Sequence, residues 1–387
     1  MTSWKTYKIG DLCKISSSKR IFAKEYKDSG IPFYRGKEII EKQKGNKIST
    51  ELYISQERYD EIKAKHGVPQ KGDMLLTSVG TLGIPYIVQD EVFYFKDGNL
   101  TWFYDFEELD SRYLYYWFLS PIGKMNIDSK AIGSTQKALT IETLSKFEIS
   151  LPPLEEQRRI VGILGAIDDK IENNCRINTN LELQAQALFD EWCKSCSKTI
   201  TIKELADNIL DYTPNENSEV VLLNSSDVTQ GVFTKLPLVS NMNLKGQFKK
   251  RFRKGDILYS EIRPRNKHYA YCYFDSDKYI ASTRLIVLRG KKEKIVSNTL
   301  LYQYLISQNV FEEFTLKTET RSGTFPQGNY QDLSSIVVPY SDNQKEIAGV
   351  LDSIYKRIWH NNTEVDNLAT LRDTLLPKLM NGEIKTE

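Results

Sequence analysis

Internal repetition is the feature of this sequence that most constrains its fold. The segment LPPLEEQRRIVGILGAIDDKI at 151–171 resembles VPYSDNQKEIAGVLDSIYKRI at 338–358, at an offset of 187 residues. The segment KGDMLLTSV at 71–79 resembles KGDILYSEI at 254–262, at an offset of 183 residues. Matches that keep the same order and nearly the same offset indicate two copies of one structural unit.

Each copy has the same internal order, a mixed segment followed by a helical one. Alternating apolar stretches such as YIVQDEVFYF at 86–95 and YIASTRLIVL at 279–288 predict strands. Pro152 and Pro339 then mark the start of a long helical segment. The predicted fold class is α+β, with two similar globular domains of mixed α and β structure joined by two long helices. The predicted segments are a first globular domain at 1–150, a first helix at 151–195, a second globular domain at 196–337, and a second helix with a C-terminal tail at 338–387.

Both helical segments carry apolar residues at alternating spacings of four and three, which is typical of a coiled coil. Asn174, Asn178 and Asn361 interrupt the pattern and predict a fixed register at some cost in stability. Two matching seams predict antiparallel pairing, with one globular domain at each end of a rod. The 29 residues from Ile160 to Leu188 would extend about 43 Å. The alternative is that each helix packs on its own domain. The predicted seam residues are Ile160, Leu164, Ile167, Ile171, Leu181, Leu188, Ile347, Leu351, Ile354, Ile358, Leu368 and Leu375.

Charge is distributed unevenly although the net charge of the chain is only +2. Residues 1–50 hold twelve basic and five acidic side chains, and residues 245–267 hold nine and two. Between these regions, residues 154–192 hold four basic and eight acidic side chains. Two basic regions separated by an acidic one favour a protein that contacts a polyanion at two places.

The sequence argues against a membrane protein. It has no run of 18 apolar residues, the minimum expected of a spanning helix. The N-terminal stretch MTSWKTYKIGDL lacks the apolar core of a secretory signal. We therefore expect a cytoplasmic protein with no membrane partner.

Motifs for metal binding and catalysis are missing. Cys193 and Cys196 form one CxxC pair, but the other cysteines and the three histidines are too far away in sequence to complete a zinc site. No GxxxxGK[ST] phosphate-binding loop is present. The string from Asp60 to Lys63 could be read as part of a nuclease site, but it is also typical of a solvated helix. We predict neither a bound metal nor a catalytic site.

The strings LPPLEEQRRIVGILGAIDDKIE, QKEIAGVLDSIYKRI and LRDTLLPKLMNGEI resemble the conserved helical regions of type I restriction–modification specificity subunits. The strings WKTYKIGDL, IPFYRGKEI and KGDMLLTSVGTLG resemble the target recognition domains of the same family. The resemblance covers essentially the whole chain. The second copy departs from the first at 340–343, and Arg372 occupies a seam position.

This resemblance implies a non-catalytic subunit that reads a split site in double-stranded DNA, with one half read by each recognition domain. It implies that the helices set the spacer and dock two modification subunits, which carry S-adenosylmethionine and methylate adenine. The chain itself would bind no cofactor, and a restriction subunit, the motor-nuclease, can join the complex. The alternative is a coiled-coil scaffold whose two heads bind protein instead of DNA.

Candidate DNA contacts follow from the chemistry of base reading, in which Arg or Lys pairs with guanine and Asn or Gln with adenine. Lysines and arginines on loops mainly contact phosphate. Arg263 and Arg265 are the best candidates for base contact, with phosphate contact as the alternative. In the first domain the candidates are Lys19, Arg20, Arg35, Lys37, Thr77, Ser78, Ser134, Gln136 and Lys137. In the second they are Lys249, Lys250, Arg251, Arg253, Arg263, Arg265, Lys267, Arg321 and Gln327.

Overall fold

Contacts between residues group the chain into two units, and each unit holds one mixed domain with part of both long helices. The first unit is Met1–Asn173 with Glu364–Glu387, and the second is Asn174–Thr363. The long helices are α6 (Leu154–Ser195) and α11 (Lys345–Met380). The structure, a computed structural model, describes residues 4–43, 45, 48, 51–131, 133, 137–242, 244, 246–320 and 326–384.

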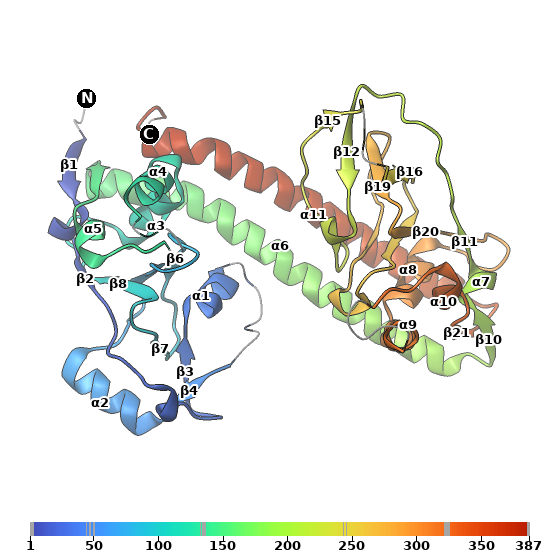
Figure 1. The fold of residues 1–387 in the computed structure, drawn as a ribbon, viewed down its shortest axis with the longest axis horizontal. Coiled ribbons are helices and arrows are strands. Elements are labelled where there is room, and N and C mark those ends of the chain that lie inside the picture. Colours follow the sequence, from blue (N-terminus) through green and yellow to red (C-terminus); the bar gives the residue numbers. More distant parts are fainter. Residues whose placement is uncertain are drawn as a thin grey trace. The chain divides into compact units, whose positions relative to one another are not determined.

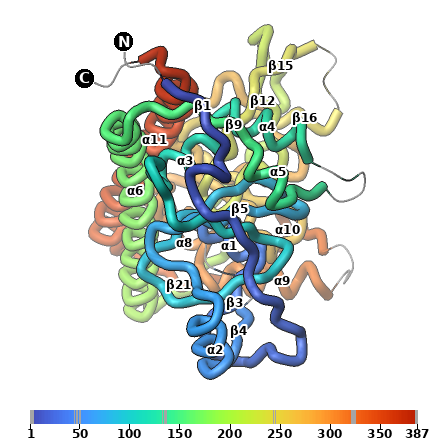
Figure 2. Tube along the Cα trace, turned by 90° about the vertical axis from the view of Figure 1, so that its left-hand side faces the viewer, coloured from blue at the N-terminus to red at the C-terminus, as the bar shows by residue number. Residues whose placement is uncertain are grey.

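The described residues of the mixed domain of the first unit form three sheets, and most of their strands are labelled in Figure 1. Their strand orders are β2-β8-β5-β6, β4-β3-β7 and β1-β9. The strands β1 and β9 are antiparallel neighbours, as the Cα trace also shows (Figure 2). The strands are β1 (Lys5–Lys8), β2 (Lys14–Ser16), β3 (Ile31–Tyr34), β4 (Tyr53–Ile54), β5 (Met74–Thr77), β6 (Pro85–Ile87), β7 (Tyr94–Phe95), β8 (Leu100–Tyr104) and β9 (Glu148–Leu151). The helices are η1 (Ile9–Asp11), η2 (Ala23–Glu25), α1 (Gly36–Gln43), α2 (Gln56–His66), α3 (Ser111–Leu119), α4 (Pro121–Lys130) and α5 (Ile141–Ser145).

The mixed domain of the second unit repeats this plan with additional strands. Its sheet orders are β11-β20-β17-β18, β15-β12-β19-β16, β10-β21 and β13-β14. The strands are β10 (Lys198–Thr201), β11 (Ala206–Asn208), β12 (Glu219–Leu223), β13 (Val228–Thr229), β14 (Val232–Phe233), β15 (Val239–Ser240), β16 (Phe248–Lys250), β17 (Ile257–Ser260), β18 (Tyr269–Tyr271), β19 (Tyr279–Ser282), β20 (Leu285–Gly290) and β21 (Val337–Tyr340). The helices are α7 (Ile202–Leu205), η3 (Ser225–Asp227), η4 (Pro264–Asn266), α8 (Asn298–Ile306), α9 (Gln308–Glu319) and α10 (Tyr330–Ser334).

Sheet pairing confirms the internal repeat. Strand β5 lies antiparallel between β6 and β8, and β17 lies in the same way between β18 and β20. Strand β3 is parallel to β7, as β12 is to β19. Each of the two alternating stretches predicted as strands contains two strands, because a turn redirects the chain into another sheet. Residues 86–95 contain most of β6 and all of β7, and residues 279–288 contain β19 and most of β20.

The central strands are buried on both faces. In β5, Met74 and Leu76 belong to one apolar cluster and Leu75 to another. In β17, Ile257 and Leu258 are divided between two clusters in the same way. A strand packed on both sides reads as a continuous apolar run, and the loops that follow it begin from a rigid base.

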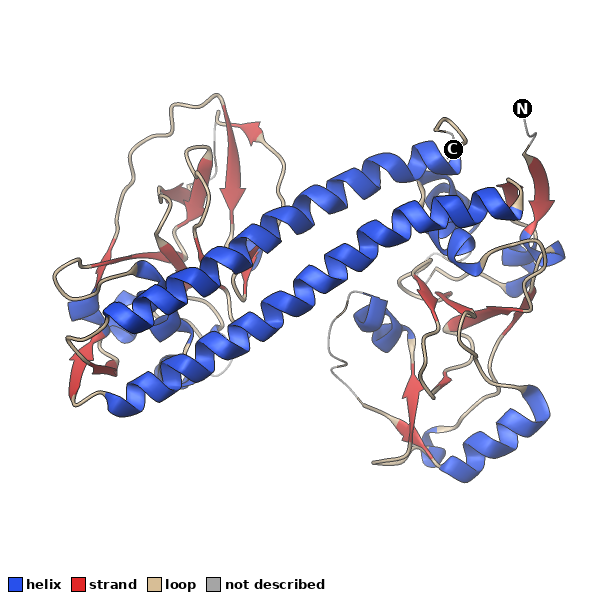
Figure 3. Cartoon of the chain, turned by 180° about the vertical axis from the view of Figure 1, so that it is seen from behind, coloured by secondary structure: helices blue, strands red, loops and turns tan. Residues whose placement is uncertain are grey.

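The long helices pair in antiparallel orientation. As residue numbers increase along α6, the residue numbers of the contacting positions in α11 decrease. In the first unit, Arg372 Nη1 lies 3.0 Å from Asp168 Oδ1. In the second unit, Asn178 Nδ2 donates to Asn362 Oδ1 at 2.7 Å, and Asn361 Nδ2 donates to Asn178 Oδ1 at 2.7 Å. These bonds within each unit confirm the antiparallel coiled coil, whose two helices are drawn in Figure 3.

The seam departs from the prediction at the end of α6. Leu188 is 44% exposed, whereas Phe189 is only 2% exposed. Phe189 packs edge-on against Tyr304 of α8, with ring centroids 4.9 Å apart. Helix α6 therefore turns a different face toward its own mixed domain here, so that helix pairing and domain packing both contribute. The other predicted seam residues are buried or half-buried, namely Ile160, Leu164, Ile167, Ile171, Leu181, Ile347, Leu351, Ile354, Ile358, Leu368 and Leu375.

None of the described helices is both long enough and apolar enough to span a bilayer.

Candidate nucleic-acid interface

Three loops of the first unit are joined by backbone hydrogen bonds. The amide of Ser78, just after β5, donates to the carbonyl of Asn99, just before β8, at 2.8 Å. The amide of Leu139 donates to the carbonyl of Ser78 at 2.9 Å. The amide of Gly80 donates to the carbonyl of Lys137 at 3.2 Å. The three loops therefore form one continuous edge at the end of the buried strand β5.

The second unit repeats all three bonds with different residues. The amide of Glu261 donates to the carbonyl of Arg284 at 3.0 Å, and the amide of Gly328 donates to the carbonyl of Glu261 at 2.8 Å. The amide of Arg263 donates to the carbonyl of Pro326 at 2.9 Å. We call these surfaces the three-loop edges. They comprise Ser78–Gly80, Asn99 and Lys137–Leu139 in the first unit, and Glu261–Arg263, Arg284 and Pro326–Gly328 in the second.

The residues of the two edges differ in chemistry although their backbones match. In the first unit, Lys137 is exposed and Asn99 is half-buried. In the second unit, Arg263 and Arg284 are exposed and Gln327 is half-buried. Lysine, arginine, asparagine and glutamine are among the side chains that distinguish base edges by hydrogen bonding. A shared backbone frame that carries different side chains can recognise different bases.

Two predicted contact residues of the first unit are buried, which corrects the prediction. Thr77 is 1% exposed, and its Oγ1 accepts the amide of Ile84 at 2.9 Å. Ser78 is 2% exposed, and its Oγ lies 2.6 Å from Oγ1 of Thr101. Both hydroxyls form hydrogen bonds inside the protein, at the end of a strand that is buried on both faces. They support the first three-loop edge but do not reach a ligand.

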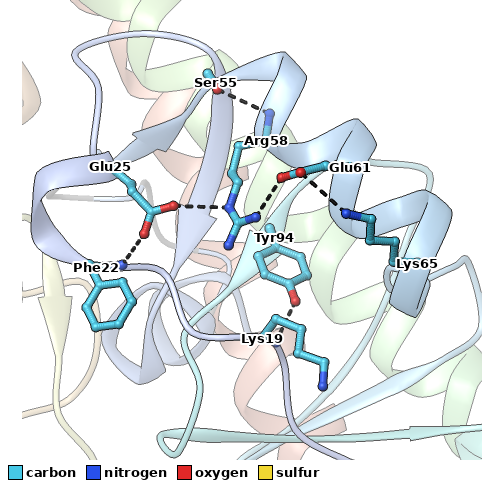
Figure 4. Close-up of polar contacts among 8 residues, drawn as sticks. All are labelled: Lys19, Phe22, Glu25, Ser55, Arg58, Glu61, Lys65 and Tyr94. Atoms are coloured by element: carbon cyan, nitrogen blue, oxygen red, sulfur yellow. Dashed lines mark hydrogen bonds and ion pairs between the residues drawn. The ribbon is translucent and has the colours of Figure 1, made fainter.

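The segment that carries Lys19 and Arg20 is anchored to the sheet next to the first edge. The Lys19 amide donates to the Tyr94 hydroxyl at 2.7 Å, and the ammonium group points away from Tyr94 (Figure 4). Arg20 Nε lies 2.8 Å from Asp97 Oδ2, two residues before Asn99. Both side chains are exposed.

Figure 4 also shows how helix α2 holds this segment. Glu25 accepts the amide of Phe22 at 2.8 Å, and its second carboxylate oxygen lies 3.0 Å from Arg58 Nε. Arg58 also binds Glu61 at 2.7 Å, and Glu61 lies 3.5 Å from Lys65. The helix that contains the Asp60–Lys63 string therefore serves as an anchor.

The guanidinium group of Arg35 is held in an ion pair with Glu38. Its Nη2 lies 2.5 Å from Glu38 Oε1 and its Nε lies 3.1 Å from Oε2. Burial by itself would raise the pKa of Glu38, but the hydrogen bonds from Arg35 outweigh it and hold this pKa below its usual value. Lys37 is exposed on α1, with its Nζ 3.9 Å from Glu41.

In the second unit, Lys250 is buried, which again corrects the prediction. It is 4% exposed, and its Nζ donates to the carbonyl of Leu285 at 2.7 Å. Burial lowers the pKa of this ammonium group. Lys249 is exposed, whereas Phe248 and Lys250 on either side of it in β16 are buried. Arg253 is exposed, and Arg251 Nη2 donates to the carbonyl of Asp277 at 3.1 Å.

Arg265 and Lys267 both contact α9. Arg265 binds Glu319 through two bonds, Nε to Oε1 at 2.5 Å and Nη2 to Oε2 at 2.8 Å. Lys267 Nζ lies 5.0 Å from the centre of the Phe311 ring. Gln327 forms a backbone bridge with Ile262 in the second three-loop edge.

Some predicted contacts lie outside the described residues, and others were missed. Ser134, Gln136 and Arg321 are outside the described part of the chain. Asn99 and Arg284 were not predicted, although the repeat contains the signal. Each immediately precedes the strand that pairs with the buried central strand of its unit.

The described residues include no cluster of three or more His, Cys, Asp or Glu side chains arranged to hold a metal ion. All five cysteines lie among the described residues, and none takes part in a disulfide. Burial raises the pKa of Cys193 to about 12.

Two repeated α+β units, each with a three-loop edge and a share of an antiparallel helix pair, define a protein that presents two related surfaces. The family model for the type I restriction modification DNA specificity domain matches residues 1–183 and again residues 197–368. The chain therefore belongs to this family, as its sequence motifs predicted. The matched domain is named for DNA specificity, and the relatives that match are specificity subunits of type I restriction enzymes.

Known relatives agree with this assignment. The HindI specificity subunit of Haemophilus influenzae is 36% identical over 174 residues, covering 44% of this chain and 37% of that protein. The MjaIX specificity subunit of Methanocaldococcus jannaschii is 24% identical, covering 99% and 94%. The S subunit of a type I restriction–modification system from M. genitalium has the same fold, with a TM-score of 0.62, 18% identity and coverage of 98% and 96%. The match spans less than two thirds of the length of the HindI subunit.

Proposed function

We propose that this chain reads a bipartite site in double-stranded DNA, with one three-loop edge at each half-site. The observation that carries the proposal is the recurrence of the same three backbone hydrogen bonds in both units. A rigid frame with variable side chains is suited to reading two different short sequences. The exposed cations Lys19, Lys249 and Arg253, outside the three-loop edges, would contact phosphate and set the register.

We also propose that the long helices dock two modification subunits. The supporting observation is a patch that recurs at an offset of 187 residues. Gly162 and Gly349 have open space where a Cβ would lie, and the adjacent Ile163 and Val350 are each 40% exposed. A glycine in an exposed helix destabilises it by roughly 0.5–1 kcal/mol relative to alanine, but it lets a second backbone approach closely. Two equivalent patches suit two copies of one partner.

The modification subunits would supply S-adenosylmethionine and methylate adenine, and a restriction subunit would join them for cleavage. In this proposal the chain is cytoplasmic and contributes recognition alone. Incubation of the purified chain with labelled S-adenosylmethionine and duplex DNA should then give no methyl transfer. Addition of the modification subunit should restore it.

DNA titration at several salt concentrations tests the reading function. A chain that neutralises several phosphates should lose affinity steeply as salt rises. Methylome sequencing of a host that expresses the chain with its modification subunit should then give a motif of two specific halves separated by a spacer. Binding without salt dependence, together with a methylome that lacks such a motif, would support the scaffold alternative.

Docking is tested by counting partners. Ile163→Glu should reduce the number of bound modification subunits from two to one, as should Val350→Glu, and the double variant should bind none. Leu183→Glu is a matched control, because Leu183 is 65% exposed on α6 but has no apolar equivalent at the same offset, where Thr370 stands. Retention of two subunits by the double variant would contradict the docking proposal.

A further inference from the structure

Arg263 adopts a backbone conformation that side chains disfavour. Its φ is 46° and its ψ is 68°, in the left-handed region, and it immediately precedes Pro264. Residues before proline are restricted further, toward extended conformations. The equivalent position in the first three-loop edge is Gly80, whose φ is 80° and which has no Cβ to clash. Glycine is therefore the residue that the frame itself favours here.

Surrounding hydrogen bonds hold Arg263 in this conformation. Its amide donates to the carbonyl of Pro326 at 2.9 Å, and its carbonyl accepts the amide of Asn266 at 2.9 Å. The Lys267 amide donates to the carbonyl of Pro264 at 2.8 Å, which closes the turn. Strain that is fixed by its surroundings in this way is most common at functional sites.

The neighbouring arginine is engaged differently. Two of the donors that Arg265 would offer to guanine, its Nε and one Nη, instead bind Glu319 of α9. The N–H donors of a guanidinium lie in one plane, so a guanidinium paired in this way has fewer donors left for a base edge. Arg265 therefore ties the turn to α9, whereas Arg263 is exposed on the three-loop edge itself.

We propose that Arg263 is a specificity-determining residue of the second unit and contacts a guanine in its half-site, while Arg265 is a positioning residue that acts through Glu319. The inference rests on the proposed reading of DNA and names the residue that would do it. It also explains why an arginine stands where the frame favours glycine.

The key variant is Arg263→Gly, because it removes the side chain and relieves the backbone strain. We expect the thermal midpoint to stay the same or rise. Discrimination against the wrong base at one position of one half-site should fall roughly 5- to 150-fold, the range for one bidentate pair. The other half-site should keep its preference. The assay is binding of the complex with its modification subunits to duplex libraries randomised at each half of the methylome-derived motif.

Gln230→Gly is the matched control. Gln230 lies in the same unit, is exposed, and also has a positive φ of 47°. This substitution relieves the same kind of strain, so it should raise or preserve the thermal midpoint without changing any base preference. Arg265→Ala and Glu319→Gln should resemble each other, with weaker binding and the same preferred base.

Three results would overturn the inference. One is that Arg263→Gly keeps the preferred base while binding stays intact, which would leave the proposed DNA reading standing. Another is that Arg263→Gly lowers the affinity equally for all DNA sequences and reduces the slope of log K against log salt, which would make Arg263 a phosphate contact. The third is a change of preferred base in Arg265→Ala but not in Arg263→Gly. If the complex that contains the chain without substitutions fails to bind DNA in a salt-dependent manner, this result would instead contradict the proposed function.

Discussion

At the scale of single residues, burial separates side chains that the sequence makes look alike. Lys249 and Lys250 are adjacent and of one type, yet one faces solvent and the other donates to the carbonyl of Leu285. Charge clustering predicted a basic surface at 245–267 but could not assign faces, because β16 is only three residues long and is bulged. The prediction that Thr77 contacts DNA was wrong for a related reason. Strand β5 is buried on both faces, so buried and exposed residues do not alternate along it.

This difference predicts opposite outcomes for two matched substitutions. Lys249→Met should weaken DNA binding evenly across sequences and reduce the slope of log K against log salt by about one, as expected for one lost phosphate contact. Lys250→Met keeps the buried stem and should leave both affinity and slope unchanged. Fluorescence anisotropy at several salt concentrations checks both variants. Equal effects of the two would contradict the assignment of faces.

At the scale of elements, the helix pattern was predictable where helix meets helix. The four-three spacing of apolar residues correctly predicted buried positions such as Ile160 and Leu351. It could not predict that Phe189 replaces Leu188 at the end of α6, because Tyr304 of α8, in the mixed domain, packs against that side chain. Packing of a helix against a globular domain, unlike pairing of two long helices, leaves no heptad signal.

The shifted face of α6 predicts very different costs for neighbouring truncations. Phe189→Ala removes a buried ring from its contact with Tyr304 and should lower the free energy of unfolding by about 3–5 kcal/mol. Leu188→Ala removes a side chain that is 44% exposed and should change it by less than about 1 kcal/mol. Urea denaturation measures both variants. A larger loss of stability for Leu188→Ala than for Phe189→Ala would support the predicted seam position of Leu188.

The asparagine cluster within the helix pair is a second element with a testable role. Asn178→Leu removes the partner of the buried Asn361 amide and should cost about 1–3 kcal/mol. Replacing both residues by leucine should recover much of this stability, because no donor is then left unpaired, but should weaken the preference for one register. Crosslinking of cysteine pairs placed in neighbouring registers distinguishes the variants. A single register in the double variant would mean that other contacts define the alignment.

At the scale of the whole molecule, the sequence predicted the repeat but not the three-loop edges. Two copies at a nearly constant offset predicted two α+β units and paired helices directly from the sequence. The edges depend on backbone bonds between residues far apart in the chain, such as the Gly80 amide and the Lys137 carbonyl, and no short motif encodes such a bond. Comparison of the two copies within one structure reveals them.

Two edges in separate units predict independent reading. Lys137→Ala should affect only the half-site read by the first unit, and Arg284→Ala only the half-site read by the second. Because the two residues belong to different units and share no contact residue in their edges, the binding losses in the double variant should add within about 0.5 kcal/mol. Competition binding against duplexes altered in one half at a time measures each term. A combined loss that differs from the sum by more than this, with the fold intact, would show that the two units read DNA as one coupled surface.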